Sequence, residues 1–122
     1  MNTGIVLIVD DEQDICLMLS NIINKKTYKP AAFVHSISEA GRWLKHQHPS
    51  LIFLDNNLPD GKGVDFIASV KILFPDIRIV MITAYDTPTD RRMAIENGAD
   101  EFIGKPFSRQ MIYSVVDKFL HL

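Results

Sequence analysis

The 122-residue sequence has few features of secreted, membrane-spanning or nucleic-acid-binding chains. Its single cysteine, Cys16, excludes an internal disulfide framework and a cysteine-rich metal site, and favours a reducing compartment. No apolar run exceeds five residues, whereas a membrane-spanning helix needs about 20, and residues 1–4 lack the basic start of a secretory signal. The formal net charge of -2 offers no basic surface for nucleic acid. We therefore expect a cytoplasmic protein that contacts neither membranes nor nucleic acid directly.

The composition is that of a folded domain. Hydrophobic residues make up 47% of the chain and charged residues 23%, which is enough apolar material for a core and argues against disorder. Single domains commonly contain about 100–150 residues. The chain has no internal repeat or low-complexity tract, so residues 1–122 are predicted to form one domain.

Two kinds of apolar pattern alternate along the chain. Runs rich in apolar residues predict strands at residues 5–9, 31–34, 51–54, 77–82 and 101–103. The first and third of these runs are continuously apolar, which indicates strands buried on both faces. Apolar residues at helical spacing predict helices over residues 11–26, after Ser36, over 64–73, from Pro88 to Asn97, and after Ser108. The N-caps expected for the second, fourth and fifth of these helices are Ser36, Thr87 and Ser108. Residues 55–63 are rich in turn formers. Five strand–helix units predict an α/β fold, with a parallel sheet covered by helices on both faces.

Polar side chains follow four of the predicted strands at their carboxyl ends. Asp10 and Asp11 follow the first strand, Asp55 the third, Thr83 the fourth and Lys105 the fifth. Ligands of such sheets bind outside the carboxyl ends of the strands. Carboxylates that meet there would repel one another, and Mg²⁺ resolves this because it takes oxygen ligands. Together with a lysine and a hydroxyl, they indicate a site for a phosphoryl group.

Taken singly, each of these residues has a plainer interpretation. An aspartate at a strand end most often caps a helix or stabilises a turn, and Asp11 is expected to cap the first helix as well. Lys105 alone would be a solvated lysine, and Thr83 alone a residue with high strand propensity. The occurrence of the whole set at successive strand ends favours a functional site.

The motifs around these residues resemble those of the receiver domain of bacterial two-component response regulators. The matching segments are Val9-Asp10-Asp11-Glu12, Leu54-Asp55-Asn56-Asn57-Leu58-Pro59 with Gly63, Ile82-Thr83-Ala84, and Phe102-Ile103-Gly104-Lys105-Pro106-Phe107. The resemblance covers essentially the whole chain. It implies a flavodoxin-like, doubly wound five-stranded parallel sheet of order 2-1-3-4-5 with five helices.

The resemblance also implies a role for each residue of the site. Asp55 would accept a phosphoryl group from a sensor histidine kinase or a histidine phosphotransfer protein. Mg²⁺ would be held by Asp10, Asp11, Asp55 and the backbone carbonyl of Asn57. Two further residues would serve the phosphoryl group: Lys105, aimed by a cis bond to Pro106, would pair with a phosphoryl oxygen, and Thr83 would donate to another.

A switch would follow phosphorylation. In the family, a ring on the fifth strand follows the threonine inward, and here that ring is Phe102, which could equally be plain core. The surface of the fourth helix, fifth strand and fifth helix would then change shape and control an output domain or partner, and a homodimer through this surface is one expectation. Tyr85 would shield the phosphoryl group from water.

Two other functions compete with this interpretation. A Mg²⁺-dependent phosphohydrolase also forms an aspartyl phosphate, but typically carries an acid/base aspartate where this chain has Asn57, and has a cap domain. A receiver-like module that only binds partners would not need Asp10, Asp11, Asp55, Thr83 and Lys105 together. We therefore expect a signalling domain whose only catalysis is its own phosphorylation and dephosphorylation.

Overall fold

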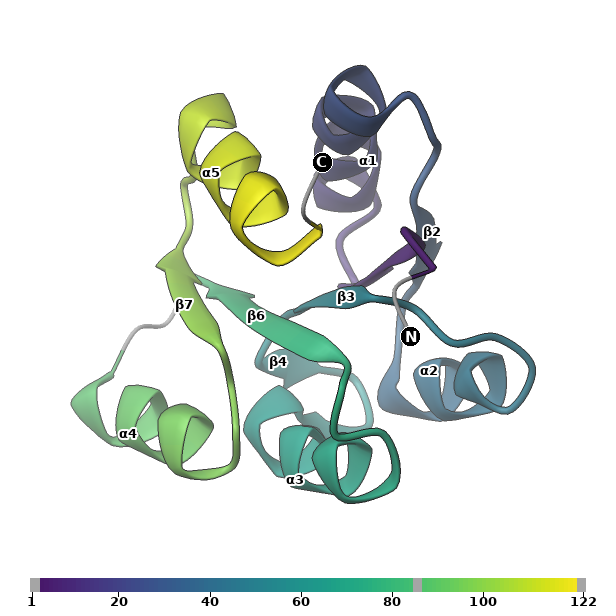
Figure 1. Ribbon diagram of the computed structural model, residues 1–122. Coiled ribbons are helices and arrows are strands. Elements are labelled where there is room, and N and C mark those ends of the chain that lie inside the picture. The colour runs from purple at the N-terminus through teal and green to yellow at the C-terminus, as the bar shows by residue number, and fades with distance from the viewer. Residues whose placement is uncertain (1–2, 85–86, 121–122) are drawn as a thin grey trace.

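The computed structural model describes residues 3–84 and 87–120. Its main feature is a five-stranded parallel sheet in the order β2-β1-β3-β6-β7 (Figure 1). The strands are β1 (Val6–Val9), β2 (Ala32–Val34), β3 (Leu51–Leu54), β6 (Arg78–Thr83) and β7 (Glu101–Gly104). Counted along the chain, these are the five predicted strands in the order 2-1-3-4-5, so the predicted fold class is confirmed.

The five helices form two layers around the sheet. Helices α1 (Gln13–Thr27) and α5 (Arg109–Leu120) cover one face, and α2 (Ile37–Leu44), α3 (Gly63–Leu73) and α4 (Pro88–Glu96) cover the other (Figure 1). Alternate residues of the central strands supply the two cores. In β1, for example, Ile8 packs with α1 and α5, whereas Leu7 packs with α2 and α3.

The expected helix N-caps are present at three helices. The Ser36 hydroxyl accepts from the amide of Glu39 at 3.1 Å, Thr87 accepts from Asp90 at 3.0 Å, and the Ser108 hydroxyl accepts from Met111 at 3.1 Å. These side chains satisfy amides that the first turn of a helix leaves unpaired. Local sequence therefore determines where these helices begin.

The expected cap at the first helix is wrong. The helix begins at Gln13 with Glu12 as N-cap, and the cap side chain makes no hydrogen bond there. The carboxylate of Asp10, not that of Asp11, accepts from the amide of Glu12 at 2.9 Å. Asp11 is exposed, whereas the side chain of Asp10 is turned back under the start of the helix.

The turn-rich stretch after β3 contains a short antiparallel hairpin, β4 (Asn57–Leu58) and β5 (Gly61–Lys62), that was not predicted. Its two pairs of residues join Asn57 to Lys62 and Leu58 to Gly61. The carboxylate of Asp60, in the turn between the two strands, accepts from the amides of Ile37 and Ser38, both at 2.9 Å, and so ties this loop to the start of α2. Within the described residues, no helix is long and apolar enough to cross a membrane.

One residue outside the core is held in an unfavourable backbone conformation. Tyr28 ends α1 with φ of 61°, and its side chain is 89% exposed. A left-handed conformation costs a non-glycine residue about 1–2 kcal/mol. Glycine avoids this cost, but it loses more conformational entropy on folding, and that loss cancels part of the gain. We expect Tyr28→Gly to raise the free energy of unfolding by up to about 1 kcal/mol in urea titrations. Lys29→Gly, at the next exposed position, should give no gain, and equal effects of the two would contradict this account.

Candidate functional site

Four carboxylates converge at the carboxyl edge of the sheet. Asp10, Asp11 and Glu12 follow β1, Asp55 follows the neighbouring β3, and one oxygen of each lies within 4.8 Å of the others. Asp10 and Asp55 are buried, at 3% exposure each, whereas Asp11 and Glu12 are exposed. The convergence follows from topology, because β1 and β3 are paired in parallel and end at the same level.

Lys105 supplies the positive charge of this cluster. It follows β7, and its Nζ lies 2.8 Å from Asp10 Oδ2, 3.1 Å from Glu12 Oε1 and 3.8 Å from Asp55 Oδ1. The bond between Lys105 and Pro106 is cis, as expected. Only 9% of the lysine side chain is exposed, so its charge acts mainly on these three carboxylates.

The electrostatics of the cluster raise the pKa of one carboxylate, that of Asp55. Burial and the neighbouring charge of Asp10 raise the pKa of Asp55 to about 6, although Lys105 and the amide of Asn56 oppose the change. Burial alone would lower the pKa of Lys105, but its hydrogen bond with Asp10 and the charge of Asp55 raise that pKa above its usual value. The lysine therefore stays charged at neutral pH while Asp55 remains largely available as a carboxylate.

The loop after β3 holds Asp55 closely. The amide of Asn56 donates to Asp55 Oδ1 at 2.9 Å, and the buried Asn56 side chain accepts from the amide of Val64 at 3.1 Å. Gly63 passes so near that a Cβ placed on it would lie 2.3 Å from the backbone oxygen of Asp55. Glycine is thus required at position 63 by close packing against the backbone of Asp55.

Two side chains hold the backbone carbonyl of Asp10 in place. Its carbonyl oxygen accepts from His35 Nδ1 at 2.9 Å and from Cys16 Sγ at 3.3 Å. A carbonyl only accepts, so His35 carries its proton on Nδ1. Burial, followed by the charge of Asp10, raises the pKa of Cys16 to about 12, which keeps it a thiol. Together, His35 and Cys16 fix the peptide that joins Asp10 to Asp11.

Three of the four carboxylates, all but Asp10, line a cavity of about 310 Å³. The predicted residues Asp11, Asp55, Asn57 and Lys105 line it, together with two that were not predicted, Glu12 and Ala84. Glu12 could have been identified from the sequence, because it is a third acidic residue directly after Asp10 and Asp11. His35 also escaped prediction, although it directly follows β2 and so belongs to the same sheet edge.

The remaining predicted residues lie around this cavity in different ways. Thr83 is fully buried at the end of β6 and is paired with Gly104, so it stands beside the strand that carries Lys105. The ring of Phe102 is partly buried against the core, and the guanidinium of Arg91 lies 4.7 Å from its centroid. Tyr85 lies outside the described residues.

Comparisons with known proteins agree with this geometry. Residues 6–117 match the family model described as the response regulator receiver domain. The chain belongs to the response regulator receiver domain family. Members of this family act in two-component signalling and are phosphorylated on an aspartate.

Individual relatives differ in how much of their length this receiver domain spans. It is 36% identical to the phosphate regulon transcriptional regulatory protein PhoB of Escherichia coli strain K12 over 84% of this chain but 45% of PhoB. It is 31% identical to the chemotaxis protein CheY of Thermotoga maritima over 93% of this chain and 94% of CheY. The beryllofluoride-activated NtrC4 receiver domain dimer superposes with a TM-score of 0.89 at 33% identity, over 95% of each chain. The chain thus spans less than half of PhoB and nearly all of CheY.

The close approach of Gly63 to the backbone of Asp55 leads to a test of the packing in this loop. Gly63→Ala should lower the free energy of unfolding by about 1–3 kcal/mol, because the new Cβ must displace the backbone of Asp55. Gly41→Ala is a matched control in the interior of α2, where an added Cβ meets nothing within 4 Å, and it should raise stability by about 1 kcal/mol. Urea unfolding of both variants measures the effect, and a neutral Gly63→Ala would contradict the packing argument.

Proposed function

We propose that Asp55 is the phosphoacceptor of this receiver domain and that residues 1–122 act as one signalling domain. The observation that carries the proposal is a buried carboxylate, 3% exposed, that faces both Lys105 and a cavity lined by further carboxylates. Burial raises the pKa of Asp55, whereas the charge of Lys105 lowers it. Asp55 is therefore shielded from bulk water, yet it is ionised enough at neutral pH to act as a nucleophile.

The reaction is a phosphoryl transfer. A carboxylate oxygen of Asp55 attacks phosphorus, the new O–P bond gives an acyl phosphate, and the N–P bond of a phosphohistidine breaks with its electron pair left on the imidazole nitrogen. Lys105 would pair with a phosphoryl oxygen, and Thr83 would donate its hydroxyl to another. These residues act by position and charge, which is the main source of catalysis in phosphoryl transfer. The domain would catalyse only this transfer and the hydrolysis of its own acyl phosphate.

The residues present fit a magnesium ion. One oxygen of each of four carboxylates lies within 4.8 Å of the others, and a hard cation takes such oxygen ligands and relieves their repulsion. Asp10, Asp11 and Asp55, with the backbone carbonyl of Asn57, would hold it. When bound, Mg²⁺ would neutralise charge on the phosphoryl oxygens during transfer.

The proposed switch surface consists of α4, β7 and α5. The ring of Phe102 would follow Thr83 inward after phosphorylation, and it would then leave the guanidinium of Arg91 that now lies 4.7 Å from the ring centroid. Such a contact contributes about 0.5–1 kcal/mol at an exposed site, which is small enough for a phosphoryl group to overcome. The resulting surface would control an output domain or a partner.

The partners follow from the family. Receiver domains take phosphoryl groups from histidine kinases and histidine phosphotransfer proteins, and we propose the same donors here, in the cytoplasm. A homodimer through α4, β7 and α5 also remains a prediction. Ile95 of α4, which is 61% exposed, would be covered by it.

The assignment of Asp55 is tested by chemical phosphorylation. With acetyl phosphate and Mg²⁺, intact mass spectrometry should show one added phosphoryl group on the native chain and none on Asp55→Asn. Asp14→Asn, an exposed aspartate in the first turn of α1, should behave like the native chain. Modification of Asp55→Asn to the native extent would overturn the assignment. Rapid release of phosphate over many turnovers would instead favour a phosphohydrolase.

The hold of His35 on Asp10 predicts an effect on metal binding. Residues that orient metal ligands typically change affinity by about 10–100-fold when mutated. His35→Ala should therefore weaken Mg²⁺ binding about tenfold in calorimetric titrations, because the Asp10 carbonyl loses its donor at 2.9 Å. His35→Asn, whose amide can replace the Nδ1 donor, should restore most of the affinity. His46→Ala, exposed beyond α2, should have no effect, and a native affinity in His35→Ala would contradict the prediction.

A further inference from the structure

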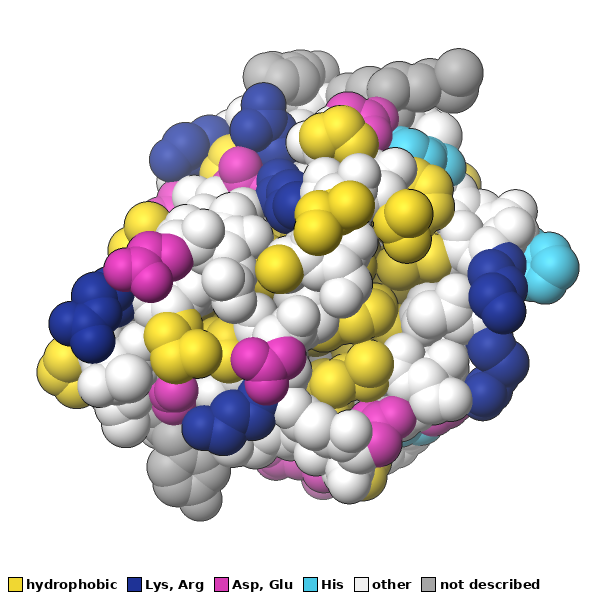
Figure 2. Space-filling view, turned by 90° about the horizontal axis from the view of Figure 1, so that it is seen from below, with side chains coloured by type: hydrophobic (Ala, Val, Ile, Leu, Met, Phe, Trp, Pro, Cys, Tyr) yellow, Lys and Arg dark blue, Asp and Glu magenta, His cyan; other side chains and the backbone are white. Residues whose placement is uncertain are grey.

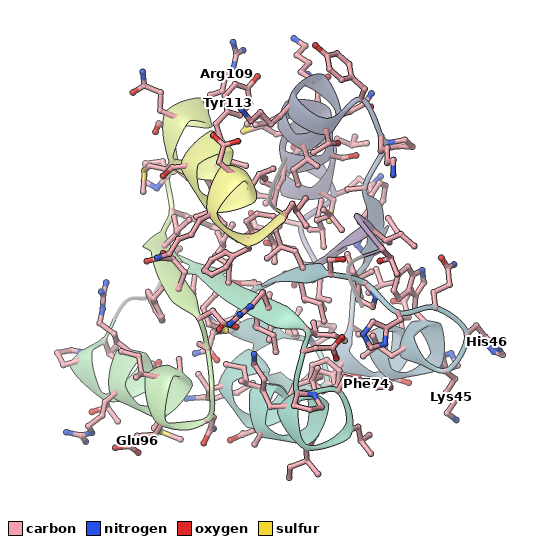
Figure 3. All side chains as sticks on the ribbon, in the orientation of Figure 1. Lys45, His46, Phe74, Glu96, Arg109 and Tyr113 are labelled. Atoms are coloured by element: carbon pink, nitrogen blue, oxygen red, sulfur yellow. The ribbon has the colours of Figure 1, made fainter. Side chains whose placement is uncertain are left out.

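Glu12 lines the carboxylate cavity and plays no part in the proposed function. On the face formed by α2, α3 and α4, acidic and basic side chains lie beside one another (Figure 2). Among the described residues that line the cavity, by contrast, three are acidic and one, Lys105, is basic. Arg109, the next basic residue of the chain, is exposed and extends outward from α5 (Figure 3). The carboxylates of the cavity therefore compete for the charge of Lys105.

Lys105 donates its hydrogen bonds to carboxylates other than Asp55. Its Nζ donates to Asp10 Oδ2 at 2.8 Å and to Glu12 Oε1 at 3.1 Å. Asp55 Oδ1 lies 3.8 Å from the same nitrogen, which is beyond hydrogen-bond distance. An ammonium group has three N–H donors, and these two partners take two of them. The lysine that is proposed to serve the phosphoryl group is therefore held elsewhere before that group arrives.

Of the two carboxylates that hold Lys105, Glu12 is the one that can release it. Asp10 is 3% exposed, and its other oxygen accepts from the amide of Glu12 at 2.9 Å, so its position is fixed. The carbonyl of Glu12 accepts from the amide of Cys16 at 3.1 Å, which fixes the backbone of Glu12 as well. The side chain of Glu12, however, is 59% exposed. It can turn into solvent and release Lys105 without any movement of the backbone.

The start of α1 does not account for a glutamate at position 12. Glu12 is the N-cap of α1, yet its side chain makes no cap hydrogen bond. Serine, threonine, aspartate and asparagine are preferred at N-caps because their side chains satisfy the first amides of the helix. A negative charge also stabilises a helix N-terminus, but Asp14 in the first turn already supplies one. The longer side chain of Glu12 instead reaches a lysine 93 positions away in the sequence.

We propose that Glu12 is a positioning residue that holds Lys105 back from Asp55 and so slows the phosphorylation of this domain. The proposal rests on the proposed function, in which Asp55 is the phosphoacceptor and Lys105 pairs with a phosphoryl oxygen. An incoming phosphoryl group must draw Lys105 out of its hydrogen bond with Glu12. Because both partners of that hydrogen bond are charged, it is about twice as strong as a neutral one. Phosphorylation is therefore slower than it would be with an uncharged residue at position 12.

The rate of phosphorylation of the full chain by acetyl phosphate tests this role. The Asp55 carboxylate takes the phosphoryl group, acetate leaves, and intact mass spectrometry follows the gain in mass at saturating Mg²⁺. Glu12→Gln keeps the acceptor oxygen but removes the charge, and it should react about fivefold faster than the native chain. Asp14→Asn, which removes a charge from the first turn of the same helix, is the matched control and should react at the native rate. A native rate in Glu12→Gln, or an equal gain in Asp14→Asn, would overturn the proposal.

Glu12→Asp separates the contact with Lys105 from the charge of the cavity. Aspartate is shorter by one methylene group and is a preferred N-cap, so its carboxylate should turn to the amides of α1 and leave Lys105. This variant keeps the negative charge and should still react about fivefold faster than the native chain. A native rate would assign the effect to charge alone and overturn the proposal.

Magnesium binding provides a measurement that does not depend on phosphorylation. In calorimetric titrations, neither Glu12→Gln nor Glu12→Asp should bind Mg²⁺ more tightly than the native chain, because neither change adds a ligand. A gain in Mg²⁺ affinity that matched the gain in rate would assign the effect to the metal and overturn the proposal.

Asp55→Asn in the same phosphorylation assay distinguishes failure of this role from failure of the proposed function. If Asp55→Asn is modified to the native extent, the proposed function is wrong and the role of Glu12 is wrong with it. If Asp55→Asn is not modified and the Glu12 variants react at the native rate, only the role of Glu12 is wrong.

Discussion

The ion pairs of Lys105 hold together the edge of the sheet on which everything else depends. Two unit charges about 4 Å apart near a protein surface interact by roughly 4 kcal/mol, so buried carboxylates at Asp10 and Asp55 would oppose folding if left alone. Lys105 lies 2.8 Å from one and 3.8 Å from the other. It offsets only part of this cost, because burial, followed by the charge of Asp10, still raises the pKa of Asp55 to about 6. Because the carboxylates still repel one another, the site favours binding of a further positive charge.

The rigid backbone around Asp10 and Asp55 keeps their carboxylates close together. Asp55 is held by the amide of Asn56 and by the close passage of Gly63, and the carbonyl of Asp10 by His35 and Cys16. If either loop could relax, the carboxylates would move apart into solvent and their electrostatic strain would disappear. The neighbouring buried strands prevent this, because β1 and β3 are each fully buried and paired along their length. The fold thus stabilises an arrangement that its own charges disfavour.

Much of the architecture could be read from local pattern. Runs rich in apolar residues predicted all five strands to within a residue or two. Ser36, Thr87 and Ser108 marked the starts of their helices, because these features depend on neighbours in the chain. The cap of α1 was misassigned to Asp11, because two adjacent aspartates offer the same chemistry and only packing decides which of them turns back. The β4–β5 hairpin was missed because its two-residue strands carry no periodic signal.

The sequence by itself determined the order of strands and helices and which strand ends carry Asp10, Asp55 and Lys105, since periodicity and residue type are properties of the chain. The tertiary structure alone decided which side chains meet. The contacts of Glu12 with Lys105 and of His35 with Asp10 join residues 93 and 25 positions apart, and no local pattern encodes such a distance.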